Sequence, residues 1–496
     1  MLSKSKYCSF VQCPKNLWLK TYRPDLETSD ASLDSRLESG NEIGDLAMQL
    51  FGDFVEVTSY KEDGRLDLSA MIDKTSDLIG KGQSVICEAS FSYDGNYCAV
   101  DILKKEENGY AIYEVKSSTH ASRIYAVDIA YQKYVLEHCG VKVTGTYLVC
   151  INADYVFDGR LRLNEFFQIV DVSAAVEEEF VQVEENVLSA KDVMRRASAP
   201  DCDLSESCQD PYPCAFWEYC SEHLPKPSVF DLYRLGFRKE IEYYKKGIVS
   251  YKDLENDKVM KNHIRSLQVK HELYDLGTYT DKKGIRSFLD TLSFPLYFLD
   301  FETMQPIIPE FVGTKPFAQI PFQYSLHYME SADDSLHHKE FLGISGEDPR
   351  RAIAEQLCAD IPKDVCVLAY NKSFECGRIR ELAATFPDLA EHLLNIESHI
   401  KDLIDPFRAG YYYNRAMGGS FSIKSVLPAI YPNEPTLDYH NLEGVHNGGE
   451  AMELFPKIKD MMPEEQAMAR YNLLKYCELD TYAMVKVWEE LIRVSK

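Results

Sequence analysis

The pattern of apolar and polar positions predicts four elements around which the chain is organised. Two short apolar runs that alternate with polar residues predict a β-hairpin over residues 99–119. Apolar stripes with helical spacing predict one helix over residues 36–54 and another over residues 471–491. The apolar run FPLYFLDFET, residues 294–303, predicts a buried strand that opens a second module of strands and helices. The chain is therefore predicted to be an α/β protein.

The dipeptide Asn108-Gly109 is expected to form the turn of the hairpin. Asn-Gly is a strong hairpin signal because both residues tolerate the positive φ of a type I′ turn. With these two residues as the loop, Asp101 lies opposite Lys116. Because side chains alternate across a strand, Asp101, Glu114 and Lys116 are predicted to project from one face.

Two carboxylates beside a lysine are suited to metal-assisted hydrolysis of a phosphodiester. The carboxylates hold a divalent cation, which lowers the pKa of a bound water, and the lysine orients that water or stabilises charge in the transition state. The alternative is a solvent-facing hairpin with one cross-strand ion pair. From the spacing alone, both interpretations stay open.

Length and composition indicate several domains with large cores. The chain has 496 residues, of which 45% are hydrophobic, and this length suggests roughly two to four domains. No apolar run approaches the roughly 18 residues that span a bilayer, and the first residues lack the apolar core of a secretory signal. We therefore expect a cytoplasmic protein with no membrane partner.

The charge of the chain is acidic overall but not in every region. The net charge is −25, from 54 basic and 79 acidic residues, which argues against a protein that coats nucleic acid without sequence preference. Residues 226–290 differ, since they hold 14 basic and 10 acidic residues with tyrosines interleaved. This stretch is predicted to be a helical connector, which either guides nucleic acid between two modules or is an ordinary amphipathic linker.

Cysteines gather at one place in the sequence. The chain has 14 cysteines, and Cys208, Cys214 and Cys220 are separated by five residues each in a loop with prolines and aromatic residues. Closely spaced thiolates bind zinc or an iron–sulfur cluster, and three thiolates are one fewer than a full set. Cys202 would complete a local Zn²⁺ site, whereas Cys13 would be a fourth ligand from almost 200 residues upstream.

Residues 1–225 resemble the core of the PD-(D/E)XK nucleases, in which an acid leads into a hairpin that ends in Glu-x-Lys. The acid and the E-V-K sequence of the predicted hairpin match this motif. The resemblance implies a restriction-endonuclease-like fold in which Lys116 activates water, Glu88 is an upstream acid and Gln132 is the glutamine of the following helix. The implied ligands of Mg²⁺ or Mn²⁺ are Glu88, Asp101 and Glu114.

The same region is similar to the RecB-like, AddB-like and CRISPR-associated iron–sulfur exonucleases. These proteins place one cysteine before the nuclease core and three after it, so that a [4Fe–4S] cluster joins the two ends of the module. The context of Cys13, CP-x-x-L-W-L, resembles that of the first cysteine of this family. The implied ligands of a 4Fe-4S cluster are Cys13, Cys208, Cys214 and Cys220.

The second module contains an ordered set of acidic motifs. The predicted strand ends in Asp300-x-Glu302, and Tyr476 and Asp480 lie four residues apart on one face of the last helix. Between them, the sequence N-x-x-F-E ends in Glu375. In this order the motifs resemble the three exonuclease motifs of the DnaQ-like family, in the variant that carries a tyrosine.

This resemblance, over residues 291–496, implies an RNase H-like fold and a two-metal 3′–5′ exonuclease in which Tyr476 positions the attacking water. The implied ligands of the two ions are Asp300, Glu302, Glu375 and Asp480. The middle acid of the family is usually an aspartate, so Glu375 departs from the pattern, and Asp402 in HIKDLIDPF is the alternative to it.

We therefore expect a two-nuclease protein with a nuclease module over 1–225, a basic connector over 226–290 and an exonuclease module over 291–496. The pairing resembles bacterial proteins of the same arrangement. The expected partner is nucleic acid, as single-stranded DNA or DNA ends, and the expected task is trimming or degrading these ends in repair or in defence against foreign DNA.

Two alternatives stay open at this point. In the first, one nuclease module is inactive and the protein is a nucleic-acid-binding adaptor for a helicase or a CRISPR-like complex. The other alternative is an exonuclease that processes RNA, because the choice of DNA rests on analogy. The chain has no G-x-x-x-x-G-K-[ST] sequence and is not expected to hydrolyse ATP itself.

Overall fold

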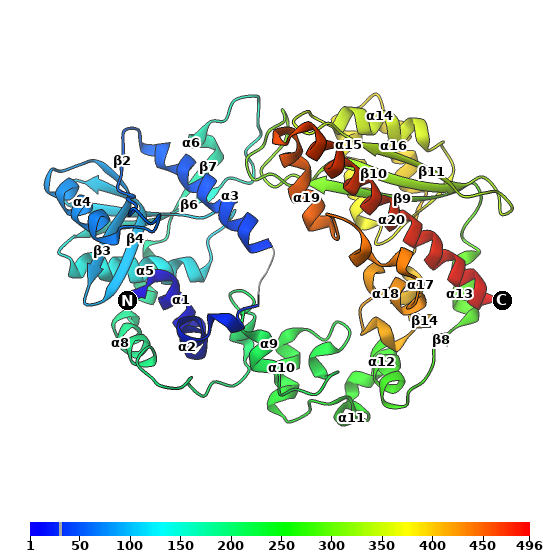
Figure 1. The fold of residues 1–496 in the computed structure, drawn as a ribbon, viewed down its shortest axis with the longest axis horizontal. Helices are drawn as coiled ribbons and strands as arrows, with labels where there is room; N and C mark the ends of the chain where they lie inside the picture. Colours follow the sequence, from blue (N-terminus) through cyan, green and yellow to red (C-terminus); the bar gives the residue numbers. More distant parts are fainter. Residues whose placement is uncertain (29–31) are drawn as a thin grey trace. The chain divides into compact units, whose positions relative to one another are not determined.

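The chain divides into two compact units in the computed structural model. The structure describes residues 1–28 and 32–496, and for residues 32–39 it describes the backbone alone. The first unit comprises Met1–His223 and Ile307–Phe317, and the second comprises Leu224–Pro306 and Ala318–Lys496. Each unit contains its own β-sheet with helices packed against it (Figure 1). Among the described helices, none has the length and apolarity needed to cross a membrane.

The first unit is built on a mixed seven-stranded sheet. The strands are β1 (Leu2–Ser3), β2 (Val55–Glu56), β3 (Val85–Tyr93), β4 (Asn96–Glu106), β5 (Gly109–Val115), β6 (Val143–Ile151) and β7 (Phe167–Asp171). Their order is β2-β3-β4-β5-β6-β7, and β1 pairs with β4. The β3–β4–β5 meander is antiparallel, whereas β5 and β6 are parallel. A parallel pair needs a crossover connection, and here the crossover is the central helix α5.

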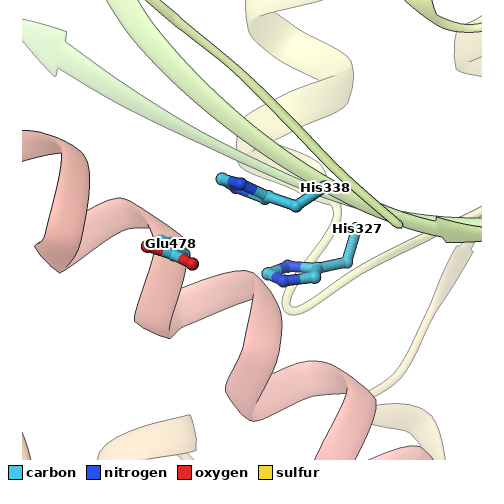
Figure 2. Close-up of side chains that lie close together, drawn as sticks. All are labelled: His327, His338 and Glu478. Atoms are coloured by element: carbon cyan, nitrogen blue, oxygen red, sulfur yellow. The ribbon is translucent and has the colours of Figure 1, made fainter. Parts of the chain in front are cut away.

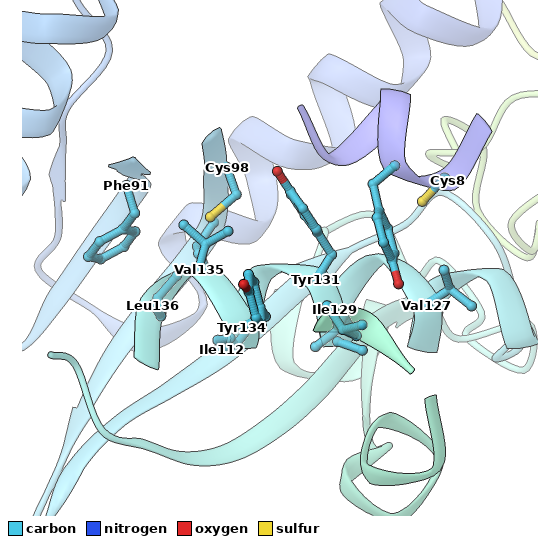
Figure 3. Close-up of a cluster of buried hydrophobic side chains, with 14 of the residues drawn as sticks. Cys8, Phe91, Cys98, Ile112, Val127, Ile129, Tyr131, Tyr134, Val135 and Leu136 are labelled. Atoms are coloured by element: carbon cyan, nitrogen blue, oxygen red, sulfur yellow. The ribbon is translucent and has the colours of Figure 1, made fainter. Parts of the chain in front are cut away.

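Helices cover both faces of this sheet. They are α1 (Lys4–Gln12), α2 (Pro14–Tyr22), α3 (Ser32–Ala47), α4 (Leu68–Gly80), α5 (Arg123–His138), α6 (Leu163–Phe166), α7 (Ser173–Phe180), α8 (Val183–Val193) and α9 (Trp217–Ser221), with short 3₁₀ turns at Pro24–Leu26, Met48–Phe51 and Glu206–Cys208. One core lies between the sheet and α5, where Tyr131 and Leu136 share a cluster with Phe91 and Ile112 (Figure 3). The predicted helix over 36–54 is confirmed in α3 and the following 3₁₀ turn.

The turn of the β4–β5 hairpin differs from the prediction. Glu106 pairs with Gly109, so Glu107 and Asn108 form the loop, and neither Asn108 nor Gly109 has a positive φ. The expected type I′ turn on Asn-Gly is therefore wrong. A close approach explains the glycine instead, since a Cβ on Gly109 would lie 2.3 Å from the carbonyl oxygen of Lys142, just before β6.

The register of the hairpin changes with its turn. Ile102 pairs with Tyr113, which places Asp101 opposite Glu114 and not opposite Lys116 as predicted. The observed register is shifted by two residues, and because the side-chain period of a strand is two, the shift leaves every side chain on its predicted face. The two carboxylates therefore face each other directly.

The second unit is built on a five-stranded sheet. Its strands are β9 (Leu296–Met304), β10 (Ile320–Met329), β11 (His337–Leu342), β12 (Cys366–Ala369) and β13 (Ile400–Asp402). The order is β11-β10-β9-β12-β13, with antiparallel pairing from β11 to β9 and parallel pairing from β9 to β13. The predicted buried strand over 294–303 is confirmed as β9, the central strand.

Helices cover both faces of the second sheet. The larger ones are α14 (Arg350–Asp360), α15 (Ser373–Thr385), α16 (Ala390–Ser398), α18 (Ile423–Ile430), α19 (Gly448–Lys457) and α20 (Pro463–Ser495), with α17 (Asp405–Arg408) and 3₁₀ turns at Arg415–Met417, Pro435–Leu437, Tyr439–Asn441 and Ile458–Asp460. Side chains of α14, α15 and α16 share a core with one face of the sheet. The other face packs on α20 and α19, as in the ring contacts of Phe298 with Trp488 and Phe322 with Phe455.

The predicted connector belongs to the second unit and has its own small core, which includes Val229, Leu254 and Val269. Its helices are α10 (Phe237–Lys245), α11 (Tyr251–Leu254), α12 (His263–Leu273) and α13 (Lys282–Leu289), with 3₁₀ turns at Val229–Asp231 and Lys258–Lys261. The short strand β8 (Tyr279–Thr280) pairs with β14 (Tyr412–Tyr413). The stretch is therefore helical, as predicted.

Candidate active sites

Glu114 is the centre of the first candidate site. It is the penultimate residue of β5, it is fully buried, and it accepts three hydrogen bonds. Lys116 Nζ lies 2.6 Å and Lys4 Nζ 2.8 Å from its Oε1, and Gln132 Nε2 lies 2.7 Å from its Oε2. Burial alone would raise the pKa of Glu114, but Lys116 and Lys4 hold it well below its usual range. This buried carboxylate is therefore ionised and neutralised by two ammonium groups.

Asp101 and Glu88 line the same part of the sheet. The Asp101 carboxylate accepts a 2.7 Å hydrogen bond from the backbone N–H of Val115 and lies 3.5 Å from Lys4 Nζ. Burial and the nearby Glu114 raise the pKa of Asp101 to about 6. Burial, followed by the charge of Asp101, raises the pKa of Glu88 to about 7. The predicted acids Glu88, Asp101 and Glu114 are therefore brought together.

Glu88 has an unusual backbone conformation, with a φ of 55° in the middle of β3. A residue other than glycine rarely adopts this left-handed region, and such strain is concentrated at functional sites. Strand β3 pairs Cys87 with Ile102 and Ala89 with Val100, so Glu88 lies at the position opposite Asp101.

The helix α5 supplies the predicted Gln132 and an acid that the sequence reasoning missed, Asp128. Asp128 Oδ2 lies 3.1 Å from Lys116 Nζ, and its Oδ1 accepts a 3.1 Å hydrogen bond from Gln132. The signal was available, because residues four apart share a face of a helix. Burial would lower the pKa of Lys116, but Glu114 and Asp128 raise it above its usual range, so this side chain acts as a cation.

The cysteines predicted to bind a cluster also meet in the first unit. Cys13 lies between α1 and α2, and one small cavity is lined by five thiols, those of Cys13, Cys202, Cys208, Cys214 and Cys220. Burial raises the pKa of Cys220 to about 11 and that of Cys214 above its usual value. The geometry therefore gathers both of the alternative fourth ligands, Cys13 and Cys202, with the other three.

Three carboxylates converge at the second candidate site. Asp300 and Glu302 leave β9 on the face that α20 covers, and Asp480 approaches from α20. Ligand atoms of these three residues lie within 4.8 Å of one another. Burial, followed by the nearby Asp480, raises the pKa of Glu302 to about 8 and that of Asp300 well above its usual value. The carboxylates therefore repel one another in a buried place that offers little compensating charge.

Glu375 in the first turn of α15 faces the same group. Its side chain is 2% exposed, and its Oε2 has no hydrogen-bond partner among the described residues. Burial raises its pKa to about 8, and its charge contributes to the raised pKa of Asp300. A buried carboxylate without a partner is costly, so Glu375 has a free oxygen that a cation would satisfy.

Asp402, the alternative to Glu375, has a different environment. Its two oxygens accept hydrogen bonds from the backbone N–H groups of Asn371, at 2.8 Å, and Lys372, at 3.2 Å. These groups open the turn that leads into α15, and Asn371 has a left-handed φ of 68°. Asp402 is therefore occupied in holding the start of the helix that carries Glu375.

Two tyrosines and a lysine complete the second site. Tyr439 donates a 2.7 Å hydrogen bond to Asp480 Oδ1, and Lys424 Nζ lies 3.2 Å from the hydroxyl of the predicted Tyr476. Burial and the charge of Asp480 raise the pKa of Tyr476 far above its usual range, so the hydroxyl keeps its proton. Sequence reasoning missed Lys424 in α18 and Tyr439 in the 3₁₀ turn at Tyr439–Asn441, which lie between the second and third motifs.

These residues open into a cavity of about 740 Å³ within the second unit. Its lining includes all five predicted residues of this site, Asp300, Glu302, Glu375, Tyr476 and Asp480. The predicted connector also contributes, through Tyr233 and Arg234, and the ring of Tyr233 lies 5.0 Å from that of Phe421. The site is therefore an open, partly aromatic pocket with acids at its base.

A family model described as a domain of unknown function (DUF2779) matches residues 297–422. The match begins within β9 and ends just before α18, so it contains Asp300, Glu302 and Glu375 but neither Tyr476 nor Asp480. No curated protein matches the chain.

Proposed function

We propose that the second unit is a metal-dependent exonuclease that cleaves nucleotides from a 3′ end. The observation that carries the proposal is the convergence of Asp300, Glu302 and Asp480 within 4.8 Å, with raised pKa values. Buried carboxylates without cationic partners are stabilised by divalent cations, and oxygen-only sites suit Mg²⁺ and Mn²⁺.

The arrangement of the second sheet supports the same proposal. Three antiparallel strands continued by two parallel ones, with acids on the central strand and on a C-terminal helix, fit an RNase H-like fold. The resemblance of the three motifs to the DnaQ-like family points in the same direction, and fold analogy alone would not carry a function.

The residues of this site divide the work of hydrolysis. Asp300, Glu302 and Asp480 would hold the ions, and Glu375 would supply a further oxygen. Bound divalent ions would supply Lewis-acid activation of water and stabilisation of charge on the phosphate. Tyr476 retains its proton, so it donates a hydrogen bond that orients the water. Lys424 holds the Tyr476 hydroxyl and adds positive charge beside the phosphate.

We propose that the first unit is a second nuclease, of the PD-(D/E)XK type. Asp101 and Glu114 face each other across β4 and β5 and would share one divalent ion, with Glu88 beside Asp101. Lys116 remains a cation, so its role is to orient water and stabilise charge on the phosphate. A cationic lysine cannot also act as a base, so a group other than Lys116 accepts the proton that the attacking water loses. Lys4 contacts both carboxylates and would have to move when the ion binds.

The five gathered cysteines fit a metal cofactor in the first unit. Thiolates gathered in this way bind zinc or an iron–sulfur cluster. The resemblance to the iron–sulfur exonucleases favours the larger group, and we propose a [4Fe–4S] cluster held by Cys13, Cys208, Cys214 and Cys220, which would join the N-terminal helices to the end of the module.

The proposed substrate is a nucleic-acid end, single-stranded where it enters the second site. The pocket there combines Arg234, Arg408 and Lys424 with the aromatic rings of Tyr233 and Phe421. Aromatic side chains stack on unpaired bases and basic side chains follow the phosphates. DNA repair or defence against foreign DNA is the proposed setting, in the cytoplasm.

The test uses single- and double-stranded DNA and RNA labelled at either end and digested by the full chain with Mg²⁺ or Mn²⁺. The variants are Lys116→Ala, Asp300→Asn and the double substitution, with the exposed Asp388→Asn as the matched control. We expect Lys116→Ala to retain stepwise release from 3′ ends and the double variant to lose all cleavage. If Asp300→Asn leaves 3′ release unchanged in the Lys116→Ala background, the second unit is a binding platform instead.

A further inference from the structure

A second group of potential metal ligands lies in the second unit, outside the proposed active site. His327 on β10 and His338 on β11 are a cross-strand pair, and Glu478 projects toward them from α20 (Figure 2). Ligand atoms of these three residues lie within 4.8 Å of one another. His327 is buried, His338 is partly buried and the Glu478 side chain is 33% exposed, so the group lies at the edge of the contact between the sheet and the helix.

Hydroxyl groups hold both imidazole rings in place. His327 Nδ1 lies 2.8 Å from Thr481 Oγ1, and His338 Nε2 lies 3.0 Å from Ser325 Oγ. The two hydroxyls are themselves 2.6 Å apart, so one hydrogen-bonded chain connects the two rings. Histidines that ligate metals usually have their other ring nitrogen fixed by such a partner.

The remaining atoms of the three side chains are available to a ligand. Nδ1 of His327 and Nε2 of His338 are engaged in these hydrogen bonds. Nε2 of His327 and Nδ1 of His338 therefore each have a lone pair that can bind a metal ion. Lys475 Nζ contacts Glu478 Oε2 at 2.6 Å, which leaves Oε1. Burial, with the nearby His338, lowers the pKa of His327 to about 4, so this ring is neutral near neutral pH.

We propose that His327, His338 and Glu478 bind a divalent first-row transition-metal ion, with Zn²⁺ as the best match. Two imidazoles and one carboxylate are a ligand set found at zinc sites, and imidazole ligands disfavour Mg²⁺. The ion would connect β10 and β11 to α20. Because Glu478 lies two residues before Asp480 on this helix, the ion would fix the helix that carries part of the proposed active site.

This inference concerns a structural ion and does not depend on the proposed nuclease activity. The first measurement is the zinc bound per chain at buffered free Zn²⁺, for the full-length protein and for Glu478→Gln and His338→Ala. The matched control is His337→Ala, because His337 is the neighbouring histidine on β11 and contacts Asp334 instead. We expect Glu478→Gln and His338→Ala to bind one zinc fewer per chain, or about 100-fold more weakly, and His337→Ala to match wild type.

Cysteine thiolates are also good ligands of added Zn²⁺, so the second measurement separates a nitrogen–oxygen site from the cysteines of the first unit. Co²⁺ bound by nitrogen and oxygen gives visible absorption without the near-ultraviolet charge-transfer band of thiolate ligands. We expect wild type to show the visible bands of a nitrogen–oxygen site. Glu478→Gln keeps the shape of the side chain and removes its charge, and we expect this variant to lose the bands. Equal zinc content in wild type and Glu478→Gln, or a cobalt spectrum that is purely thiolate in both, would overturn the proposal.

Discussion

The two candidate sites use the same acids but balance their charge in opposite ways. In the first unit, Glu114 is fully buried and yet ionised, because Lys116 and Lys4 lie within 2.8 Å of it. In the second unit, Glu302 is almost as buried, but this burial and the charges of Asp480 and Glu375 raise its pKa, and Lys424 is the cation that opposes them. The pKa of Glu114 is therefore lowered, whereas that of Glu302 is raised to about 8.

This difference indicates how each site depends on cations. The first site supplies its own positive charge, so its fold is stable without a metal, and an incoming ion must compete with Lys4. Among the described residues, the lysine that acts on the carboxylates of the second site is Lys424 alone, and this site is expected to be completed by bound ions. The comparison predicts which substitutions and conditions should affect one unit and leave the other unchanged.

The two lysines of the first site should behave differently although they contact the same oxygen of Glu114. In an Asp300→Asn background, Lys116→Ala should lower the remaining nuclease activity by about 10³-fold, an effect typical of single members of a catalytic group. Lys4→Ala removes the competitor of the ion, so activity should persist and the concentration of Mg²⁺ needed for half-maximal rate should fall. Equal losses of activity in the two variants would show that Lys4 belongs to the catalytic group and would break the comparison.

The middle acid of the second site can be assigned by a matched pair of substitutions. Glu375→Gln should reduce 3′ release by about 100-fold and should not destabilise the metal-free unit, because it removes a buried carboxylate that lacks a partner. Asp402→Asn should keep activity within a few-fold and cost about 1 kcal/mol of unfolding free energy, because it weakens the cap of α15. Activity assays and urea denaturation give both values, and the opposite ranking would reassign the middle acid to Asp402.

The tyrosines of the second site provide a smaller and more specific test. Tyr476→Phe should lower the rate constant of 3′ release by about 10- to 100-fold, with unchanged Mn²⁺ affinity, because the acids remain and only the hydroxyl that orients water is lost. Tyr439→Phe instead removes the hydrogen bond to Asp480, so it should change Mn²⁺ affinity. A fall in Mn²⁺ affinity in Tyr476→Phe would indicate that this hydroxyl positions the carboxylate ligands of the ion and does not orient the attacking water.

The pH dependence of stability should separate Glu114 from the other buried carboxylates of both sites, because the pKa values of Asp101 and Glu88 in the first unit are also raised. Without metal, Glu302 and Glu375 have pKa values of about 8 in the fold against 4.5 ordinarily, so between these pH values the unfolded chain has released protons that the fold retains. The second unit should therefore lose stability as the pH rises from 5 to 8, by about 3 kcal/mol for each of these carboxylates. The lowered pKa of Glu114 has the reverse effect, since its contribution is lost as the pH falls below 4.5.

Pulse proteolysis in urea with a chelator measures this pH dependence, because peptides from each unit report its unfolding separately. Saturating Mg²⁺ should abolish the loss in the second unit between pH 5 and pH 8. A second unit that is equally stable at both values without metal would contradict the unbalanced charge of its carboxylates.

Strand and helix periodicities predicted which acids share a face at each candidate site, whereas Glu88 and Glu375 came from the family resemblances and Asp128 was missed. Asp300 and Glu302 are two apart on a strand, and Tyr476 and Asp480 are four apart on a helix. The hairpin register was mispredicted because Gly109 is required by the close approach of the Lys142 carbonyl and not by the turn. That contact joins residues 33 positions apart, so no local sequence signal encodes it.

The residues that balance charge were beyond the reach of sequence patterns. Lys4 meets Glu114 across 110 residues, and Tyr439 meets Asp480 across 41, so only the folded chain brings each pair together. The role of Asp402 likewise depends on the turn at Asn371, whose backbone N–H groups it binds.

Mn²⁺ binding to the full chain tests the central claim most directly, because that claim assigns the stronger need for cations to the second unit. Titration of wild type, Asp300→Asn and Asp101→Asn, followed by the paramagnetic resonance of free Mn²⁺, gives the number and affinity of sites. We predict that Asp300→Asn loses the tightest Mn²⁺ binding and that Asp101→Asn retains it. Loss of the tightest binding in Asp101→Asn, with wild-type binding in Asp300→Asn, would contradict the account.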